Sequence, residues 1–199
     1  DLNDVMRDLR DKLKSTVDPV KASINYVNAD YDLKRQFNTA VKNAKEALSK
    51  TKGENLNERD LQGLSQAIDD TKQALNGEQR LTEAKTKADK FIKQLDSLND
   101  AQTDDLTHNV NASDNIKDIT QIVNVASDLN DAMKALQDTV SQLDQPTKDS
   151  INYQNADEDL KLQFDHAVQV AHDVLNKKDG TNIDITLSLI HISEPTRPY

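Results

Sequence analysis

One uninterrupted stretch, residues 116–143, limits the possible folds of this chain more than any other feature. It contains neither Gly nor Pro. Its apolar residues recur at steps of three and four, which places them on one face of a helix. They are Ile116, Ile119, Val123, Ala126, Leu129, Met133, Leu136, Val140 and Leu143. At the rise of an α-helix, the predicted element is about 40 Å long.

The apolar stripe of this helix shifts near Ser127-Asp128. Two successive three-residue steps, from Val123 to Ala126 and on to Leu129, rotate the stripe around the helix axis. We therefore predict that the first part of the helix ends one bundle and that the second part begins the next. A helix shared in this way would join two bundles without a flexible linker.

Self-comparison of the chain shows an internal repeat with a period of 127 residues. Residues 1–4 and 128–131 are identical and align without a gap, and Pro19 aligns with Pro146. The longest shared motif is Ile-Asn-Tyr-x-Asn-Ala-Asp, at 24–30 and again at 151–157. A repeat of this length indicates a modular array, in which each unit is a small supersecondary structure.

The repeat and the helical pattern together predict an all-α fold of tandem three-helix bundles, joined by a shared continuous helix into an elongated rod. The first bundle is expected over residues 1–78, and its segment 1–16 is the end of a helix shared with a preceding unit. The second bundle covers 79–127, and residues 128–186 are the opening of a second copy of the first bundle. On this interpretation the chain is a fragment of a longer protein.

The last segment, residues 187–199, differs from the rest. It has neither the helical period nor the acidic composition, and it does not align with the first copy. We interpret it as a non-native tail translated from a sequencing adapter, and a genuine terminal strand is the alternative. It is left out of the prediction of the fold.

Pro and Asn residues predict several helix boundaries. Pro19 should end the first helix after Asp18, because Pro lacks an amide donor and its ring clashes with the preceding turn. Asn28 is expected to cap the second helix, and its repeat partner Asn155 forms a capping-box pattern with Glu158.

Three further helix starts follow from the same reasoning. The third helix of the first bundle should begin after Asn57. Asn99 and Gln102 form another capping-box pattern, at the start of the middle helix of the second bundle. Ser113 or Asp114 should cap the long helix.

The composition agrees with small helical bundles. Apolar residues make up 35% of the chain, aromatic residues 4% and charged residues 30%, so each bundle can have only a thin apolar seam. Low hydrophobicity with a net charge of −10 is also typical of disordered chains. The regular helical spacing argues against disorder.

The charge also restricts the partners. A sequence pI near 4.8 argues against nucleic acid and against anionic membranes, since both require a basic surface. Cysteine is absent, so neither disulfides nor a thiolate metal site can form. No apolar run is long enough to span a membrane and no signal peptide is recognisable, so we expect no membrane contact within this segment.

No residue pattern indicates catalysis, a cofactor or a metal site. Phosphate-binding loops and nucleophile triads are missing from the sequence. The acidic pairs Asp69-Asp70 and Asp104-Asp105 lack the spacing of a calcium loop. His166 and His172 point about 120° apart on a helix and cannot chelate one ion together. We interpret all four histidines as surface residues: His108, His166, His172 and His191.

Two groups of residues carry a resemblance to known families. The motif at 25–30, with Phe37, Ala40-Val41 and Ala44, resembles the FIVAR repeat of bacterial cell-wall proteins. The stretches 81–85 and 98–102 resemble the GA module. The resemblance assigns residues 1–78 and 128–186 to FIVAR-like units and residues 79–127 to a GA-like unit.

Alternation of the two modules at this period is similar to the repeat regions of giant staphylococcal surface proteins, which bind extracellular matrix and are linked to resistance to hyperosmotic stress. The resemblance implies an extracellular, cell-wall-associated stalk that binds a matrix protein such as fibronectin. Serum albumin is the alternative partner, because some GA modules bind it through aromatic side chains of their second helix. Here that helix, 100–112, contains neither Tyr nor Phe.

The repeated motif supplies the candidate ligand contacts, which are Asn25, Tyr26, Asn152 and Tyr153. A purely structural role is the alternative. In that case Tyr26 would pack over the end of the bundle while Asn28 caps a helix.

Overall fold

The computed structural model of the protein describes residues 1–51, 53 and 55–182, and all regular secondary structure in these residues is α-helical. The predicted tail at 187–199 lies outside the described residues. The described residues form two compact units, one within 1–84 with 114–116 and the other within 85–113 with 117–182.

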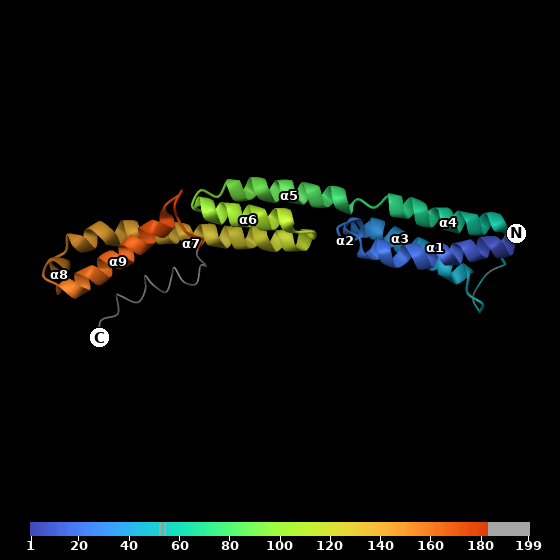
Figure 1. Ribbon diagram of the computed structural model, residues 1–199, viewed down its shortest axis with the longest axis horizontal. Helices are drawn as coiled ribbons and strands as arrows, with labels where there is room; N and C mark the ends of the chain where they lie inside the picture. The colour runs from blue at the N-terminus through green and yellow to red at the C-terminus, as the bar shows by residue number, and fades with distance from the viewer. Residues whose placement is uncertain (52, 54, 183–199) are drawn as a thin grey trace. The chain divides into compact units, whose positions relative to one another are not determined.

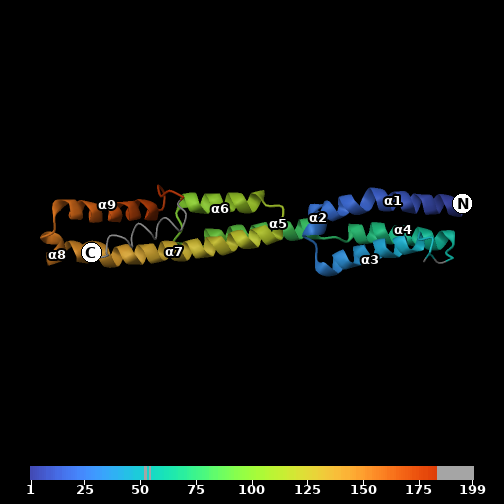
Figure 2. The same cartoon turned by 90° about the horizontal axis from the view of Figure 1, so that it is seen from below.

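Unit 1 is a bundle of three helices with one short helix at its end. Helix α1 spans Leu2–Ala22, α2 spans Ile24–Val27, α3 spans Tyr31–Ala47 and α4 spans Glu58–Gln73. Helices α1, α3 and α4 pack along one another, as Figures 1 and 2 show from two sides. Their shared core includes Leu9, Leu13, Val17, Phe37, Val41, Ala44, Leu61 and Ile68.

The prediction that Pro19 ends the first helix is wrong. Helix α1 continues through Pro19 to Ala22, and its end is set by Ser23. The Ser23 hydroxyl donates to the Val20 carbonyl (2.6 Å) and accepts from the Tyr26 amide (3.1 Å), so one side chain ends α1 and starts α2. A missing donor in the last turn of a helix removes a single hydrogen bond, which the packing of the final turn can offset.

Helix α3 also begins differently from the prediction. Its N-cap position is Asp30, without a side-chain cap bond, and Asn28 instead ends α2. The predicted start of α4 is confirmed. Asn57 and Asp60 form a capping box there, each accepting from the other's backbone amide.

Unit 2 is organised around a single long helix. Helix α7 spans Ile116–Lys148, and the shared helix predicted from the apolar pattern is thereby confirmed. It runs without a break through Ser127-Asp128, where Ala126 and Leu129 are buried. The helices that pack against the first half of α7 and those that pack against its second half therefore share one continuous helix.

Helices α5 and α6 contribute to the first bundle of unit 2. Helix α5 spans Gly77–Lys93, so its first residues belong to unit 1, and α6 spans Asp100–Ala112. The predicted capping box of Asn99 and Gln102 is confirmed at the start of α6. Gln102 is fully buried, and its Nε2 lies 3.4 Å from Sδ of Met133 on α7.

The second half of α7 packs with α8 (Ile151–Gln154) and α9 (Glu158–Leu175). His172 on α9 lies 3.3 Å from the carboxylate of Asp144 on α7, and Lys148 reaches Asp165 on α9 (3.7 Å). The capping box predicted for Asn155 with Glu158 is wrong, because Asp157 occupies the N-cap position of α9 without a side-chain cap bond. As in α1, the proline of α7 lies inside the helix, and Ser150 links its end to the next helix.

Among the described residues, no helix combines the length and the apolar character needed to cross a membrane.

The continuity of α7 can be tested at Asp128, which is exposed at the predicted shift of the apolar stripe. We expect Asp128→Pro to destabilise unit 2 by about 3 kcal/mol, because proline in a helix interior removes one hydrogen bond and clashes with the preceding turn. Asp128→Ala should stay within about 0.5 kcal/mol of the parent chain. Urea unfolding followed by circular dichroism measures both. Equal stability of the two variants would show that the helix is interrupted at this point.

Candidate functional site

The repeated motif lies on α2 and α8 and on the turns that follow these helices. In both copies a serine hydroxyl sets the start of the short helix, Ser23 before α2 and Ser150 before α8. The two motifs therefore have the same local backbone, and their surroundings can be compared residue by residue.

The two motif tyrosines pack edge-on against a phenylalanine of the next helix. The ring centroids of Tyr26 and Phe37 are 6.0 Å apart, and those of Tyr153 and Phe164 are 5.7 Å apart. Both tyrosines are half-buried. Edge-to-face pairs of this kind stabilise the bundle beyond simple burial, so each ring serves the fold and exposes only part of its surface.

The tyrosine hydroxyls have different partners in the two copies. The Tyr26 hydroxyl pairs with the side-chain amide of Asn38, at 2.9 Å from Nδ2. The Tyr153 hydroxyl donates to the carboxylate of Asp165 at 2.8 Å. This hydrogen bond raises the pKa of Tyr153 above its ordinary value.

Asp165 belongs to a charged network that the first copy lacks. Lys148 binds Asp144 (2.7 Å) and lies 3.7 Å from Asp165. The hydrogen bond from Lys148, followed by that from His172, lowers the pKa of Asp144, and the same pair raises the pKa of Lys148. In the first copy, Val17 occupies the position that aligns with Asp144.

Asn25 binds the start of α5. Its Oδ1 accepts from the Glu78 amide (3.1 Å), and its Nδ2 donates to the Leu75 carbonyl (3.2 Å). Gly77 permits this approach, since a Cβ at that position would clash with the backbone carbonyl of Asn25 and lie 2.8 Å from the Ala29 nitrogen. Asn25 thus satisfies one of the free amides at the start of a helix far along the sequence.

Asn28 binds the start of α7 in the same way. Its Oδ1 accepts from the Ile116 amide (2.8 Å), and its Nδ2 donates to the carbonyls of Asp114 (2.8 Å) and Ile24 (3.0 Å). Only 4% of Asn28 is exposed. The prediction that Ser113 or Asp114 caps α7 is wrong: Ser113 ends α6, and the side chain that binds the first amide of α7 comes from residue 28.

Asp30 completes this contact region through Asn76 and Arg80. The Asn76 amide group pairs with the backbone nitrogen (3.0 Å) and the carboxylate (2.7 Å) of Asp30. Arg80 donates to the Asn28 carbonyl and lies against the Asp30 carboxylate, both at 3.0 Å. We call Asn25, Asn28 and Asp30 the helix-start socket, because together they bind the beginnings of α5 and α7.

The second copy has the same residues in an open setting. Asn152, Asn155 and Asp157 align with the three socket residues, and all three are exposed. The Asn155 side chain donates to the Ile151 carbonyl (3.0 Å), as Asn28 does to Ile24.

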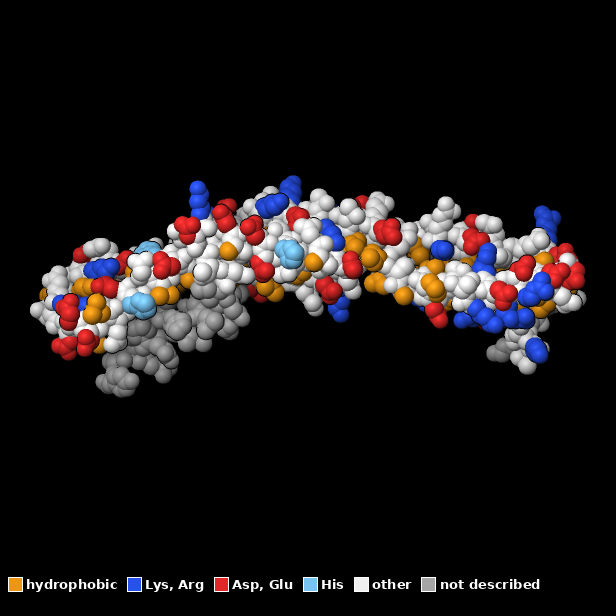
Figure 3. Space-filling view, in the orientation of Figure 1, with side chains coloured by type: hydrophobic (Ala, Val, Ile, Leu, Met, Phe, Trp, Pro, Cys, Tyr) orange, Lys and Arg blue, Asp and Glu red, His pale blue; other side chains and the backbone are white. Residues whose placement is uncertain are grey.

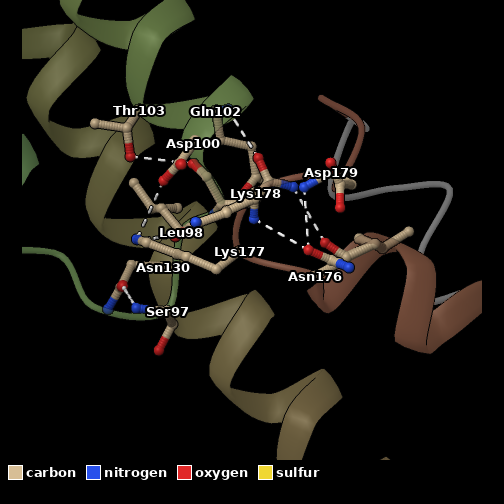
Figure 4. A network of polar contacts seen from close by, with 12 residues as sticks. Ser97, Leu98, Asp100, Gln102, Thr103, Asn130, Asn176, Lys177, Lys178 and Asp179 are labelled. Atoms are coloured by element: carbon tan, nitrogen blue, oxygen red, sulfur yellow. Dashed lines mark hydrogen bonds and ion pairs between the residues drawn. The ribbon is translucent and has the colours of Figure 1, made fainter.

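A second polar cluster joins α6 to the loop after α9 (Figure 4). The buried Asn99 side chain donates to the carbonyls of Val174 (3.1 Å) and Thr181 (3.0 Å), while the Asp100 amide donates to the Lys177 carbonyl (2.8 Å). Lys177 in turn donates to the Leu98 carbonyl (2.6 Å). The sequence pattern identified Asn99 only as a local cap, because nothing in its spacing indicates a partner near residue 177.

A groove of 580 Å³ lies beside the socket in unit 1. The C-terminal turns of α1 and α4 form its walls, with Asn25, Asp69 and Lys72 among the lining residues. Of the four predicted contact residues, Asn25 lines this groove, Tyr26 is half-buried nearby, and Asn152 and Tyr153 lie on α8 of unit 2.

Charged side chains of both signs are interspersed on the visible face of each unit (Figure 3). In the part of the chain that the structure describes, no group of three or more His, Asp or Glu side chains is arranged to hold a metal ion. The hydrogen-bonding groups of the motif therefore remain the candidate site.

Comparison with known families matches nearly the whole of the described chain. The FIVAR domain model matches residues 5–76 and 132–186, and the GA module model matches residues 78–132 between them.

The curated relatives are much longer proteins. The chain is 40% identical over 165 residues, 83% of its length, to the extracellular matrix-binding protein EbhA of Staphylococcus aureus strain Newman, of which it covers 5%. It has the same identity to the extracellular matrix-binding protein ebh of strain NCTC 8325, of which it covers 2%. The chain thus spans a small fraction of the relatives it matches.

Two solved structures share the fold. A crystal structure of the 756–1003 domain of EbhA from Staphylococcus aureus matches with a TM-score of 0.84 and 26% identity, covering 96% of this chain and 76% of that one. A Staphylococcus aureus domain, 3912–4037, described as similar to streptococcal adhesins, matches with a TM-score of 0.53 and 27% identity. That match covers 63% of this chain and 98% of the other.

The close approach at Gly77 leads to a stability prediction. Gly77→Ala should destabilise unit 1 by about 1–3 kcal/mol, because the added methyl group must displace the backbone of α2. Gly63→Ala is the matched control, since a Cβ there meets nothing within 4 Å. In the interior of α4 this change should stabilise by about 0.5–1 kcal/mol. Thermal unfolding of both variants measures the difference, and a stabilised Gly77→Ala chain would contradict the close approach.

The Asp144–Lys148 pair leads to a pH prediction. Because the pKa of Asp144 is lowered in the folded state, its contribution is fully present above the carboxyl pKa of the unfolded chain and is lost as the pH falls through the folded value. At pH 7, Asp144→Asn should cost about 1 kcal/mol or less, since the pair is partly exposed. The cost should vanish in acid.

Urea unfolding of unit 2 at neutral and at acidic pH tests this prediction. Asp128→Asn, an exposed substitution on the same helix, is the control and should show no comparable pH dependence. A cost of Asp144→Asn that persists at acidic pH would contradict the assignment to the ion pair.

Proposed function

This chain belongs to the FIVAR-domain family, with a GA module between its two FIVAR matches, and we propose that it acts as a stiff, adhesive repeat of a bacterial cell-surface stalk. The observation that supports the proposal is that the motif occurs twice while one helix of unit 2, α7, belongs to two bundles. Relatives that are 40% identical to it over 165 residues are named extracellular matrix-binding proteins.

Helix α7 supports the stalk part of the proposal. A flexible linker bends by rotating about backbone dihedrals, whereas bending α7 near Ser127 would require breaking intrahelical hydrogen bonds. The burial of Ala126, Leu129 and Met133 adds side-chain packing to that resistance. A segment built in this way would hold neighbouring bundles at a set spacing and display them away from the cell wall.

We place the matrix contact in the groove beside Asn25, with fibronectin as the expected ligand. The groove has apolar side chains from α1 and from Leu75, and it carries charges of both signs on Asp69 and Lys72 of α4. Asn25 and Tyr26 of the first copy, and Asn152 and Tyr153 of the second, mark the corresponding positions. Each contact is expected to be weak, because the groove is open and the tyrosine hydroxyls are already paired.

Repetition would convert such weak contacts into firm attachment. Tethered sites bind with an effective concentration set by their spacing, so avidity can exceed the single-site affinity by about 10²–10⁴. A long array with one groove in each complete unit would therefore hold a matrix fibre that a single unit releases quickly.

Binding to immobilised fibronectin tests this function. The chain in solution should bind weakly, whereas the same chain coupled densely to beads should be retained at least about a hundredfold more strongly. Lys72→Ala should reduce retention, and Lys14→Ala, an exposed substitution on α1 away from the groove lining, should not. Beads that bind serum albumin but not fibronectin would contradict the proposal and favour the GA module as an albumin-binding unit.

A further inference from the structure

We propose that a groove between α1 and α3 of unit 1 binds the sulfate groups of an anionic glycan chain, as found in sulfated glycosaminoglycans. The groove has a volume of 370 Å³, within the range of about 300–1,000 Å³ that is typical of small-ligand clefts. It shares no lining residue with the groove beside Asn25. The inference rests on the proposed matrix adhesion only for the source of the ligand.

Three lysines line this groove, which we call the lysine groove. Lys42 and Lys45 lie three residues apart on α3, so their side chains are neighbours on one face of that helix. Lys21 comes from the last turn of α1, which packs against α3 (Figure 2). Three ammonium groups from two helices therefore border one opening.

The positive charge of the lysine groove is mostly uncompensated. Among the described residues, only Lys42 of the three lysines forms an ion pair, with Glu46 at 3.8 Å. The side chains of this pair are 72% and 55% exposed, so the pair is weak. Three ammonium groups and one carboxylate thus line a groove in a chain whose net charge is −10. Such a local excess of positive charge attracts an anionic ligand.

The second copy shows that the bundle does not need this cluster for its packing. At the positions of Lys42 and Lys45 it has Gln169 and His172, on the corresponding helix α9. The helix forms in both copies, and the aligned side chains are exposed in both. The two lysines of α3 are therefore available for a role other than folding.

The remaining lysine is neutralised in the second copy. Lys148, which aligns with Lys21, binds Asp144 (2.7 Å) and lies 3.7 Å from Asp165. The first copy has uncharged residues at both of these carboxylate positions. The second copy thus supplies from its own side chains the negative charge that the first copy leaves to a ligand.

The chemistry of the groove favours a glycan over nucleic acid. Asn38 and Ser49 also line it and provide polar groups that can pair with sugar hydroxyls. A DNA duplex is stiff and would continue beyond the groove along a chain with a net charge of −10. A sulfated glycan is more flexible, so a short stretch of it can occupy the groove while the rest stays in solvent.

Titration of the full chain with a heparin octasaccharide tests the inference. NMR should show the largest amide shifts near Lys21, Lys42 and Lys45, and calorimetry measures the affinity. At low salt we expect Lys42→Gln/Lys45→Gln to weaken binding about tenfold, because two exposed ion pairs are lost. Added salt should weaken binding to the parent chain steeply, since binding releases counterions. An unchanged affinity of the double variant would overturn the inference.

The matched control is Lys87→Gln/Lys90→Gln. These lysines are also exposed and three residues apart on one helix, α5, so the net charge changes by the same amount. The control should alter the affinity less than about twofold, because distant exposed charges are screened. Equal losses in the two double variants would mean that binding follows net charge alone, and would also overturn the inference.

A further variant guards against an effect of the α3 substitutions on folding. Lys21→Gln changes a different helix and should weaken heparin binding about threefold. Thermal unfolding of each variant shows whether the bundle is intact. Loss of binding with an unchanged unfolding midpoint supports the site, and a Lys21→Gln chain that binds heparin like the parent would contradict it.

Two other ligands test the chemical class. A hyaluronate octasaccharide, which has carboxylates but no sulfate, and a short DNA duplex should both bind more weakly than heparin. Binding of either one as tightly as heparin, with the same dependence on Lys42 and Lys45, would overturn the assignment to a sulfated glycan. None of these titrations contains fibronectin, so failure here and failure of the proposed function remain distinguishable.

Discussion

The structure depends on satisfying the free amides at helix starts with side chains from distant parts of the sequence. A three-helix bundle with a thin apolar seam has many helix ends relative to its core, and each start leaves amides without an internal partner. Local caps serve α4 and α6, whereas α5 and α7 take acceptors from Asn25 and Asn28. Each hydrogen bond to Asn25 or Asn28 therefore caps the start of a helix and also positions its first turn.

The apolar core and the polar contacts have complementary roles. Residues such as Phe37, Ile68 and Met133 hold helices side by side, but apolar packing alone is tolerant of small shifts along the helix axis. Directional hydrogen bonds to a buried Asn are not tolerant of such shifts, because an unpaired buried amide costs more than the bond contributes. Asn99, which is almost fully buried, thus fixes the axial position of α6 against the loop after α9.

This arrangement suits a segment that occurs in repeated copies. A shared helix leaves no linker to extend within unit 2, and the capping contacts hold the ends of neighbouring helices in place. The two copies differ at positions close to the motif, as in the charged network of Asp144, Lys148 and Asp165, where the first copy has Val17, Lys21 and Asn38. The two copies therefore differ in surface chemistry, although the Asn and Asp residues of the motif are identical.

The sequence alone determined the helical class, the 127-residue repeat and the long helix through Ser127-Asp128, because the apolar period and the absence of Gly and Pro are local properties of the chain. It also identified the caps at Asn57 and Asn99, whose partners lie three residues away. Only the tertiary structure decided the role of Asn28, which contacts Ile116 across 88 positions of sequence. It likewise decided that α1 continues through Pro19, since packing of the last turn outweighs one missing hydrogen bond. Local spacing cannot encode which distant amide an Asn side chain will meet, and that choice is made when the helices pack.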